Sequence, residues 1–189
     1  MKRFFLVLFI TLSALTLCSQ NPTSELGITG YRGIDQEFQH TTLFGISFKP
    51  YITENIQLNY SLRMGGSEEN GFTLQAPLGI LGGGFLFIGS LDEDNNNWGA
   101  LAILSVIIPE GVSYNILIDY NSRFSPYINL LSMEFTKNYI QPFYEIGFTF
   151  KEYVGEKMYA ELNIGAKTIY KRFQPVGYVG GTIGIYLHD

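Results

Sequence analysis

Cysteine is almost absent from this chain of 189 residues, in which Cys18 stands alone. Cys18 lies in an N-terminal leader, so a chain without that leader can form neither disulfides nor thiolate metal sites. Histidine is nearly as scarce, with His40 and His188 as the two examples. With thiolate ligands excluded and only two histidines present, we expect no cofactor.

Charge is also sparse, at 15% of the residues, and basic residues are outnumbered by acidic ones, 12 against 17. A protein that binds nucleic acid normally carries a basic face, and none is visible here, so we expect no nucleic-acid partner. Long apolar runs are absent after the leader. A helix that spans a bilayer needs about 20 apolar residues, so this chain has no candidate for one.

Residues 1–19 have the three parts of a secretory signal peptide. Lys2 and Arg3 precede an apolar run, and the small residues Cys18 and Ser19 close the segment. We predict cleavage after Ser19, which leaves residues 20–189 as a single domain. The alternative is a lipoprotein that begins at Cys18, although Leu17 departs from the small residue expected before a lipidated cysteine.

What the chain does have is strict alternation of apolar and polar residues, clearest in 56–65. Every second residue from Ile56 to Met64 is apolar, and those between them are polar. Alternation of this kind means that the two faces of a strand meet different surroundings. Because every backbone polar group must be paired in lipid, strands can span a membrane only as a closed barrel. The abundant aromatic residues and glycine suit such a barrel.

Eight segments have the length and pattern of spanning strands, so we predict an all-β, eight-stranded antiparallel transmembrane β-barrel. An even number of strands returns both termini to the periplasmic side, where the turns are short. The segment 124–135 is ambiguous in phase, and Pro126 places it near a strand end. The predicted strands are 24–33, 41–51, 56–65, 111–119, 124–135, 140–151, 157–169 and 176–187.

The stretch 67–108 does not fit the pattern. Its two apolar arms, about 77–91 and 98–108, flank a polar tip and lack alternation. We predict a helical or irregular hairpin, inserted at the outer membrane interface or capping the barrel. The alternative makes 71–81 and 99–109 two further strands, which would give a barrel of ten.

The last strand carries the most specific local pattern. Tyr178, Gly180, Ile183 and Ile185 have the spacing of an assembly signal, although the chain ends in Asp189 rather than an aromatic residue. With its strand pattern, the chain resembles the small outer-membrane barrels of the OmpA/OmpX and porin-like superfamily of Gram-negative bacteria. The resemblance implies an outer-membrane location, contact with lipid and lipopolysaccharide, and recognition by the barrel assembly machinery. A surface or periplasmic protein is a further expected partner.

Six inward-facing charges suggest what the lumen contains. An eight-stranded barrel is only wide enough inside for side chains, and buried charges must be paired. We therefore predict a closed polar network and a non-enzymatic barrel with a structural or surface-interaction role. The alternative is a small-solute channel lined by the same residues. The predicted network consists of Lys49, Arg63, Asp119, Glu145, Glu161 and Lys167.

An enzyme is the remaining alternative. Some small barrels that this chain resembles modify lipids with a histidine at the outer rim. Here His40 lies near Asp35 and Glu37 and could act as a general base. His188 is predicted at the periplasmic end, away from outer-leaflet lipid.

Overall fold

The structure is a computed structural model. It describes residues 24–34, 40–67, 71–90, 101, 105–155, 157–169 and 175–187. The predicted signal peptide, residues 1–19, lies outside this part of the chain, as does His188.

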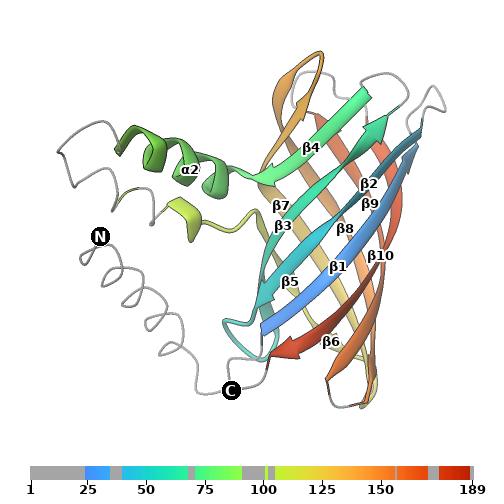
Figure 1. Cartoon of the computed structure of the whole chain (residues 1–189). Helices are drawn as coiled ribbons and strands as arrows, with labels where there is room; N and C mark the ends of the chain where they lie inside the picture. The colour runs from blue at the N-terminus through green and yellow to red at the C-terminus, as the bar shows by residue number, and fades with distance from the viewer. Residues whose placement is uncertain are drawn as a thin grey trace.

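The described strands form one antiparallel sheet that closes on itself into a barrel (Figure 1). Closure is made by β1 and β10, which pair along their whole length from Ser24 opposite Leu187 to Ile34 opposite Gly177. The start of β1 and the end of β10 therefore lie at the same rim of the barrel. The full-length strands are β1 (Ser24–Ile34), β2 (His40–Pro50), β3 (Ile56–Ser67), β7 (Ser122–Thr136), β8 (Ile140–Val154), β9 (Met158–Ile169) and β10 (Pro175–Leu187).

The fourth position in the wall is divided among three short strands. β4 (Gly71–Pro77) pairs with one part of β3, where Gln75 lies opposite Arg63. β5 (Gly111–Tyr114) pairs with the other part, where Gly111 lies opposite Asn59. Both also pair with β7, and β6 (Ile116–Leu117) extends β5 along β7. The wall thus has eight positions.

This arrangement confirms the eight-stranded prediction and overturns the ten-stranded alternative. Residues 71–77 do form a strand, but it supplies half of the fourth wall position rather than a new one. The predicted strand 111–119 supplies the other half and is shorter than expected, ending at Leu117.

The insertion that divides this wall position spans 78–110, later than the predicted 67–108. Its first part is helical, α2 (Leu78–Ser90), and projects sideways from the wall (Figure 1). The insertion leaves from within the wall and α2 projects sideways, so the predicted capping of the barrel is wrong. A place at the outer membrane interface stays a prediction. The carbonyl of Glu110, the last residue of the insertion, accepts hydrogen bonds from the backbone N–H groups of Leu130 and Leu131 on β7, whose side chains are exposed. Of the helices described, none is both long and apolar enough to cross a membrane.

The return segment of the insertion packs against α2 at a glycine. A Cβ atom on Gly79 would lie 2.3 Å from the carbonyl oxygen of Ser105 and 2.7 Å from that of Ile108. Any larger residue would push the two segments apart. The hydroxyl of Tyr60, on β3, donates a hydrogen bond to the carbonyl oxygen of Ile107 and so ties the return segment to the wall.

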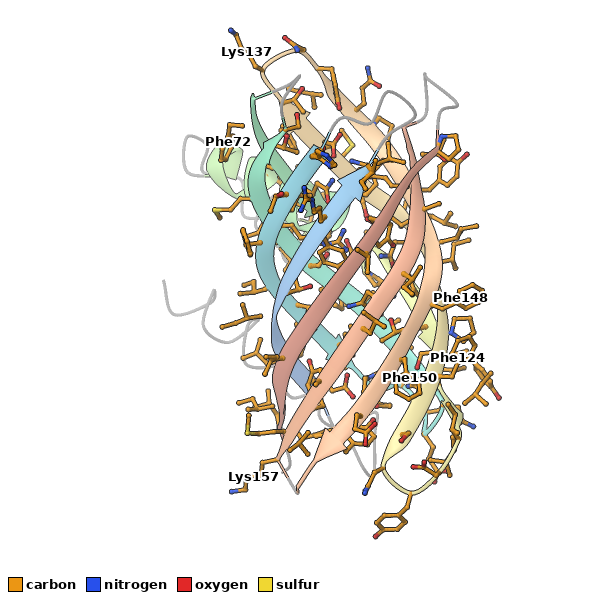
Figure 2. The ribbon with its side chains drawn as sticks, turned by 90° about the vertical axis from the view of Figure 1, so that its right-hand side faces the viewer. Phe72, Phe124, Lys137, Phe148, Phe150 and Lys157 are labelled. Atoms are coloured by element: carbon orange, nitrogen blue, oxygen red, sulfur yellow. The ribbon has the colours of Figure 1, made fainter. Side chains whose placement is uncertain are left out.

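The barrel is apolar outside and polar inside. Ile28, Phe44 and Ile183 are 72%, 62% and 64% exposed, although each is a large hydrophobic residue. Among the described residues, 24 polar or charged side chains are buried against six hydrophobic ones. Figure 2 shows Phe124, Phe148 and Phe150 on the outer face, with the rings of Phe124 and Phe148 stacked at 5.3 Å. An apolar surface of this extent suits lipid and not water.

A β-bulge in β7 explains the ambiguous phase of 124–135. The register to β8 shifts between Asn129 and Ser132, so Leu130 and Leu131 both face outward. Pro126 lies within β7, not near its end as predicted, and pairs with Phe148. Its missing N–H is tolerated because the ladder on its other side is interrupted between β5 and β6.

The register predicts that the insertion can be removed without disturbing the wall. On β3, Arg63 pairs with Gln75 and Asn59 pairs with Gly111, and four residue steps separate Arg63 from Asn59. If one leucine replaces residues 78–110, four steps also separate Gln75 from Gly111, so both pairings are kept. The shortened chain should form a closed barrel, because the side chains of β5 keep their faces. Heat-dependent mobility on a denaturing gel would measure closure.

The matched control joins Pro77 directly to Gly111. That chain is one residue shorter, and a slip of one residue turns every following side chain to the wrong face. It should fail to close. Closure of the control but not of the leucine chain would contradict the pairing described here.

Candidate functional site

The lumen holds most of the buried charge of the barrel and is the candidate site. Five carboxylates and five cations project into it from six strands and the return segment of the insertion. Because water is largely excluded, each charge needs a partner of opposite sign or several hydrogen bonds. The residues are Glu25, Glu110, Glu134, Glu145, Glu161, Lys49, Arg63, Lys151, Lys167 and Arg123.

Arg63 on β3 is the centre of the network. Its guanidinium donates two hydrogen bonds to Glu145, at 2.7 Å and 3.1 Å, and lies 3.8 Å from a carboxylate oxygen of Glu110. The same group stands 4.4 Å from the ring centre of Tyr31. A two-pronged contact of this kind fixes orientation as well as charge. Arg63 thereby joins β3 to β8 across the barrel.

Glu110 closes the gap left by the divided strand. Its side chain accepts hydrogen bonds from Ser61 on β3, at 2.7 Å, and from Ser132 on β7, at 3.2 Å. Its backbone N–H donates to the carbonyl of Asn59, and its carbonyl accepts from the N–H groups of Leu130 and Leu131. One residue thus connects both neighbouring strands where β4 has ended and β5 has not begun.

Two further clusters fill the two ends of the lumen. Towards the turn at 137–139, Glu134 accepts hydrogen bonds from Lys167, Gln75 and Tyr139. At the end where β1 begins and β10 ends, Lys49 and Lys151 lie 2.7 Å and 3.2 Å from Glu161. Lys151 also pairs with Glu25, whose other oxygen accepts a bond from Tyr51.

Neutral side chains bridge these charged clusters. Asn59 donates to Asn129 at 2.9 Å, and Asn129 in turn donates to Glu145 at 3.1 Å. Thr149 donates to Asn163 at 2.7 Å on the opposite wall. Two cavities inside the lumen measure about 30 Å³ and 20 Å³. Each has room for one or two water molecules.

The structure places five of the six predicted network residues in the lumen, namely Lys49, Arg63, Glu145, Glu161 and Lys167. Asp119 is the exception and corrects the prediction. It lies in the exposed turn after β6 rather than in a strand, because the strand ends at Leu117. The backbone N–H of Asn121 donates to its carboxylate at 2.8 Å and lowers the pKa of Asp119.

Sequence reasoning missed five charged residues of the lumen. Glu25 and Lys151 lie at the ends of predicted strands in the inward phase, so alternation alone could have found them. Arg123 preceded the predicted strand, and Glu134 lies beyond the bulge, where the phase is inverted. Glu110 follows an irregular segment and carries no periodic signal.

The four residues of the predicted assembly signal lie on β10 with alternate orientations. Tyr178 and Gly180 face the lumen, and the ring of Tyr31 covers Gly180 so closely that a Cβ there would lie 2.6 Å from it. Ile183 and Ile185 face outward. Recognition of this strand by the assembly machinery stays a prediction.

His40 begins β2 and is half-buried, with no hydrogen-bond partner for Nδ1 among the described groups. Asp35 and Glu37, its proposed partners, lie outside the described residues. Within the described ranges, no three His, Cys, Asp or Glu side chains gather closely enough to hold a metal ion.

Comparison with known proteins identifies the fold. No family model and no curated protein matches the sequence. The N-terminal β-barrel domain of Pseudomonas aeruginosa OprF superposes with a TM-score of 0.53 and 12% identity, covering 87% of this chain and 99% of that one. The attachment invasion locus protein Ail of Yersinia pestis gives a TM-score of 0.45 and 8% identity, covering 88% and 98%. The match to the OprF domain, together with the closed antiparallel sheet, shows that this chain has the fold of a small outer-membrane barrel.

The buried ion pair between Arg63 and Glu145 predicts that substitution of Arg63 greatly lowers the stability of the barrel. In Arg63→Met, Glu145 and Glu110 stay buried without their cation, which should lower the free energy of unfolding by about 3–5 kcal/mol. Urea unfolding in lipid vesicles would measure it. Asp119→Asn, in the exposed turn, should change the same quantity by less than about 0.5 kcal/mol.

A double variant separates lost charge from lost packing. Arg63→Met with Glu145→Gln removes one of the unpaired carboxylates and should regain part of the stability. An Arg63→Met barrel as stable as the original would mean that water, not the guanidinium, solvates these carboxylates.

Proposed function

We propose that this chain is a non-enzymatic barrel of the Gram-negative outer membrane, with a structural or surface-interaction role. The observation that carries the proposal is the filled lumen, in which the paired charges are separated by two small cavities of about 30 Å³ and 20 Å³. A wall of exposed apolar side chains around such a lumen supports residence in lipid without conduction. The barrel then acts through its surfaces.

The insertion is the part of that surface which departs most from a plain barrel. α2 carries no charged residue, and it leaves the wall between strands whose outward side chains are apolar. Thirteen residues are too few to cross a bilayer but can lie within one leaflet. We infer that α2 rests in the lipid beside the barrel. From there it can contact lipopolysaccharide, phospholipid or a membrane protein.

A closed lumen predicts no conductance. The purified chain in a planar lipid bilayer should give no discrete current steps at either polarity, because the ion pairs block the path. A larger porin reconstituted in the same way serves as the positive control. Regular steps whose size grows with salt concentration would favour the channel alternative.

Spin labels can test the placement of α2. In a Cys18→Ser background, labels at Gly84→Cys on α2 and Ile183→Cys on the outer wall should both be reached by oxygen and shielded from a water-soluble nickel complex. Gly84 has open space around its Cβ position, so a label should fit. Tyr120→Cys, in the turn where Tyr120 is 96% exposed, supplies the aqueous control. A label at Gly84 that behaves like the one at Tyr120 would place α2 in water.

A further inference from the structure

A cavity of about 260 Å³ opens at the end of the barrel where β1 begins and β10 ends. It is bounded by the turn 53–55 and by Tyr51, Asn115, Leu117 and Arg123. Its volume is many times that of the two lumen cavities and exceeds the roughly 30 Å³ share of one water molecule in the liquid. A small ligand with several waters therefore fits.

Arg123 is the cation that faces this cavity, and its charge is not matched. Lys49, Arg63, Lys151 and Lys167 each have a carboxylate within 3.2 Å. Arg123 has none within 4.0 Å among the described residues. The carboxylates nearest this end of the lumen, Glu25 and Glu161, are already engaged by Lys49 and Lys151. This end of the lumen therefore holds three cations and two carboxylates.

The guanidinium of Arg123 is held in place by aromatic rings. It lies 5.8 Å from the ring centre of Tyr51 and 5.2 Å from that of Tyr153, and it donates a hydrogen bond to the Tyr51 hydroxyl at 3.1 Å. Its Nε is buried and has no acceptor among the described groups. An arginine held between aromatic rings has already lost much of its conformational freedom, so binding a ligand costs little further side-chain entropy.

Asn115 adds a second donor to the same wall. It is 2% exposed, and its Oδ1 accepts a hydrogen bond from Ser125. Its Nδ2 has no acceptor among the described groups. A buried amide without a partner is costly, and because Asn115 and Arg123 both line the cavity, a turn of either side chain would let its unpartnered nitrogen bond a ligand oxygen there.

We propose that this cavity binds a compact oxyanion, a carboxylate or a phosphate group, through Arg123 and Asn115. The planar guanidinium suits both groups because it can donate two parallel hydrogen bonds. Glu54, exposed at the rim, opposes the bound charge and so weakens the site. The sequence predicts that both termini of the barrel lie on the periplasmic side, so this cavity would face the periplasm. The anion is then either a free solute or a lipid headgroup of the inner leaflet.

The test is a titration of the purified, ¹⁵N-labelled chain in uncharged detergent micelles, followed by nuclear magnetic resonance. The probes are acetate, inorganic phosphate and dihexanoyl phosphatidic acid. We expect saturable shifts of the Arg123 Nε–H and Asn115 side-chain amide signals. Saturation by acetate or inorganic phosphate indicates a free oxyanion, and saturation by the lipid alone indicates a headgroup.

Two variants at Leu117 leave Arg123 in place and test whether the positive charge of Arg123 binds the anion. Leu117 is exposed and lies opposite Arg123 in the ladder between β6 and β7. Leu117→Glu places a carboxylate beside the guanidinium of Arg123. This carboxylate should take the charge-assisted hydrogen bond that the anion would otherwise accept, and so weaken anion binding at least tenfold. Leu117→Gln is the same size and should bind like the original chain.

Two more variants complete the design. Arg123→Gln should abolish the saturable shift of Asn115, and Glu54→Gln should tighten binding about two- to fivefold, as expected for an exposed charge. The unfolding midpoint of each variant checks that the barrel is closed. Shifts that do not saturate, or equal affinities for Leu117→Glu and Leu117→Gln, would overturn the proposal. Neither result bears on conductance or on the position of α2.

Discussion

No water in the core of a bilayer can hydrogen-bond a free peptide group, and the wall of this barrel follows from that constraint. β1 and β10 pair from end to end because an open edge would leave a row of unpaired groups. The divided fourth position obeys the same rule. Where the ladder stops at Pro77, the backbone of Glu110 pairs with both neighbours, and Tyr60 pairs with the carbonyl of Ile107.

Once the wall is closed, the side chains divide between two environments. Those outside meet lipid and are apolar, and those inside share a space too narrow for bulk water. Charges there are stable only as sets, which is why Arg63 serves both Glu145 and Glu110, and why Glu161 serves two lysines. The polar interior thus links strands that do not touch through their backbones, such as β3 and β8.

The sequence predicted the barrel because a period of two is a local property, readable in a stretch such as Ile56–Met64. It could not predict pairings such as Lys49 with Glu161, which depend on a register set by the whole closed sheet. The bulge at Leu130 and Leu131 hid the inward phase of Glu134. The eight-stranded prediction placed β4 in the insertion, and only the ten-stranded alternative made 71–81 a strand. A segment of seven residues that ends in a proline and leads into an apolar helix resembles the insertion more than a wall.

The divided strand also separates the chain into two groups of consecutive hairpins, one from Ser24 to Pro77 and the other from Gly111 to Leu187. Arg63 with Glu145, Lys49 with Glu161 and Lys151 with Glu25 all join one group to the other. A polypeptide cut within the insertion would therefore keep these ion pairs and both seams of the sheet. In this sense the barrel is a complex of two complementary half-barrels that a covalent tether happens to connect.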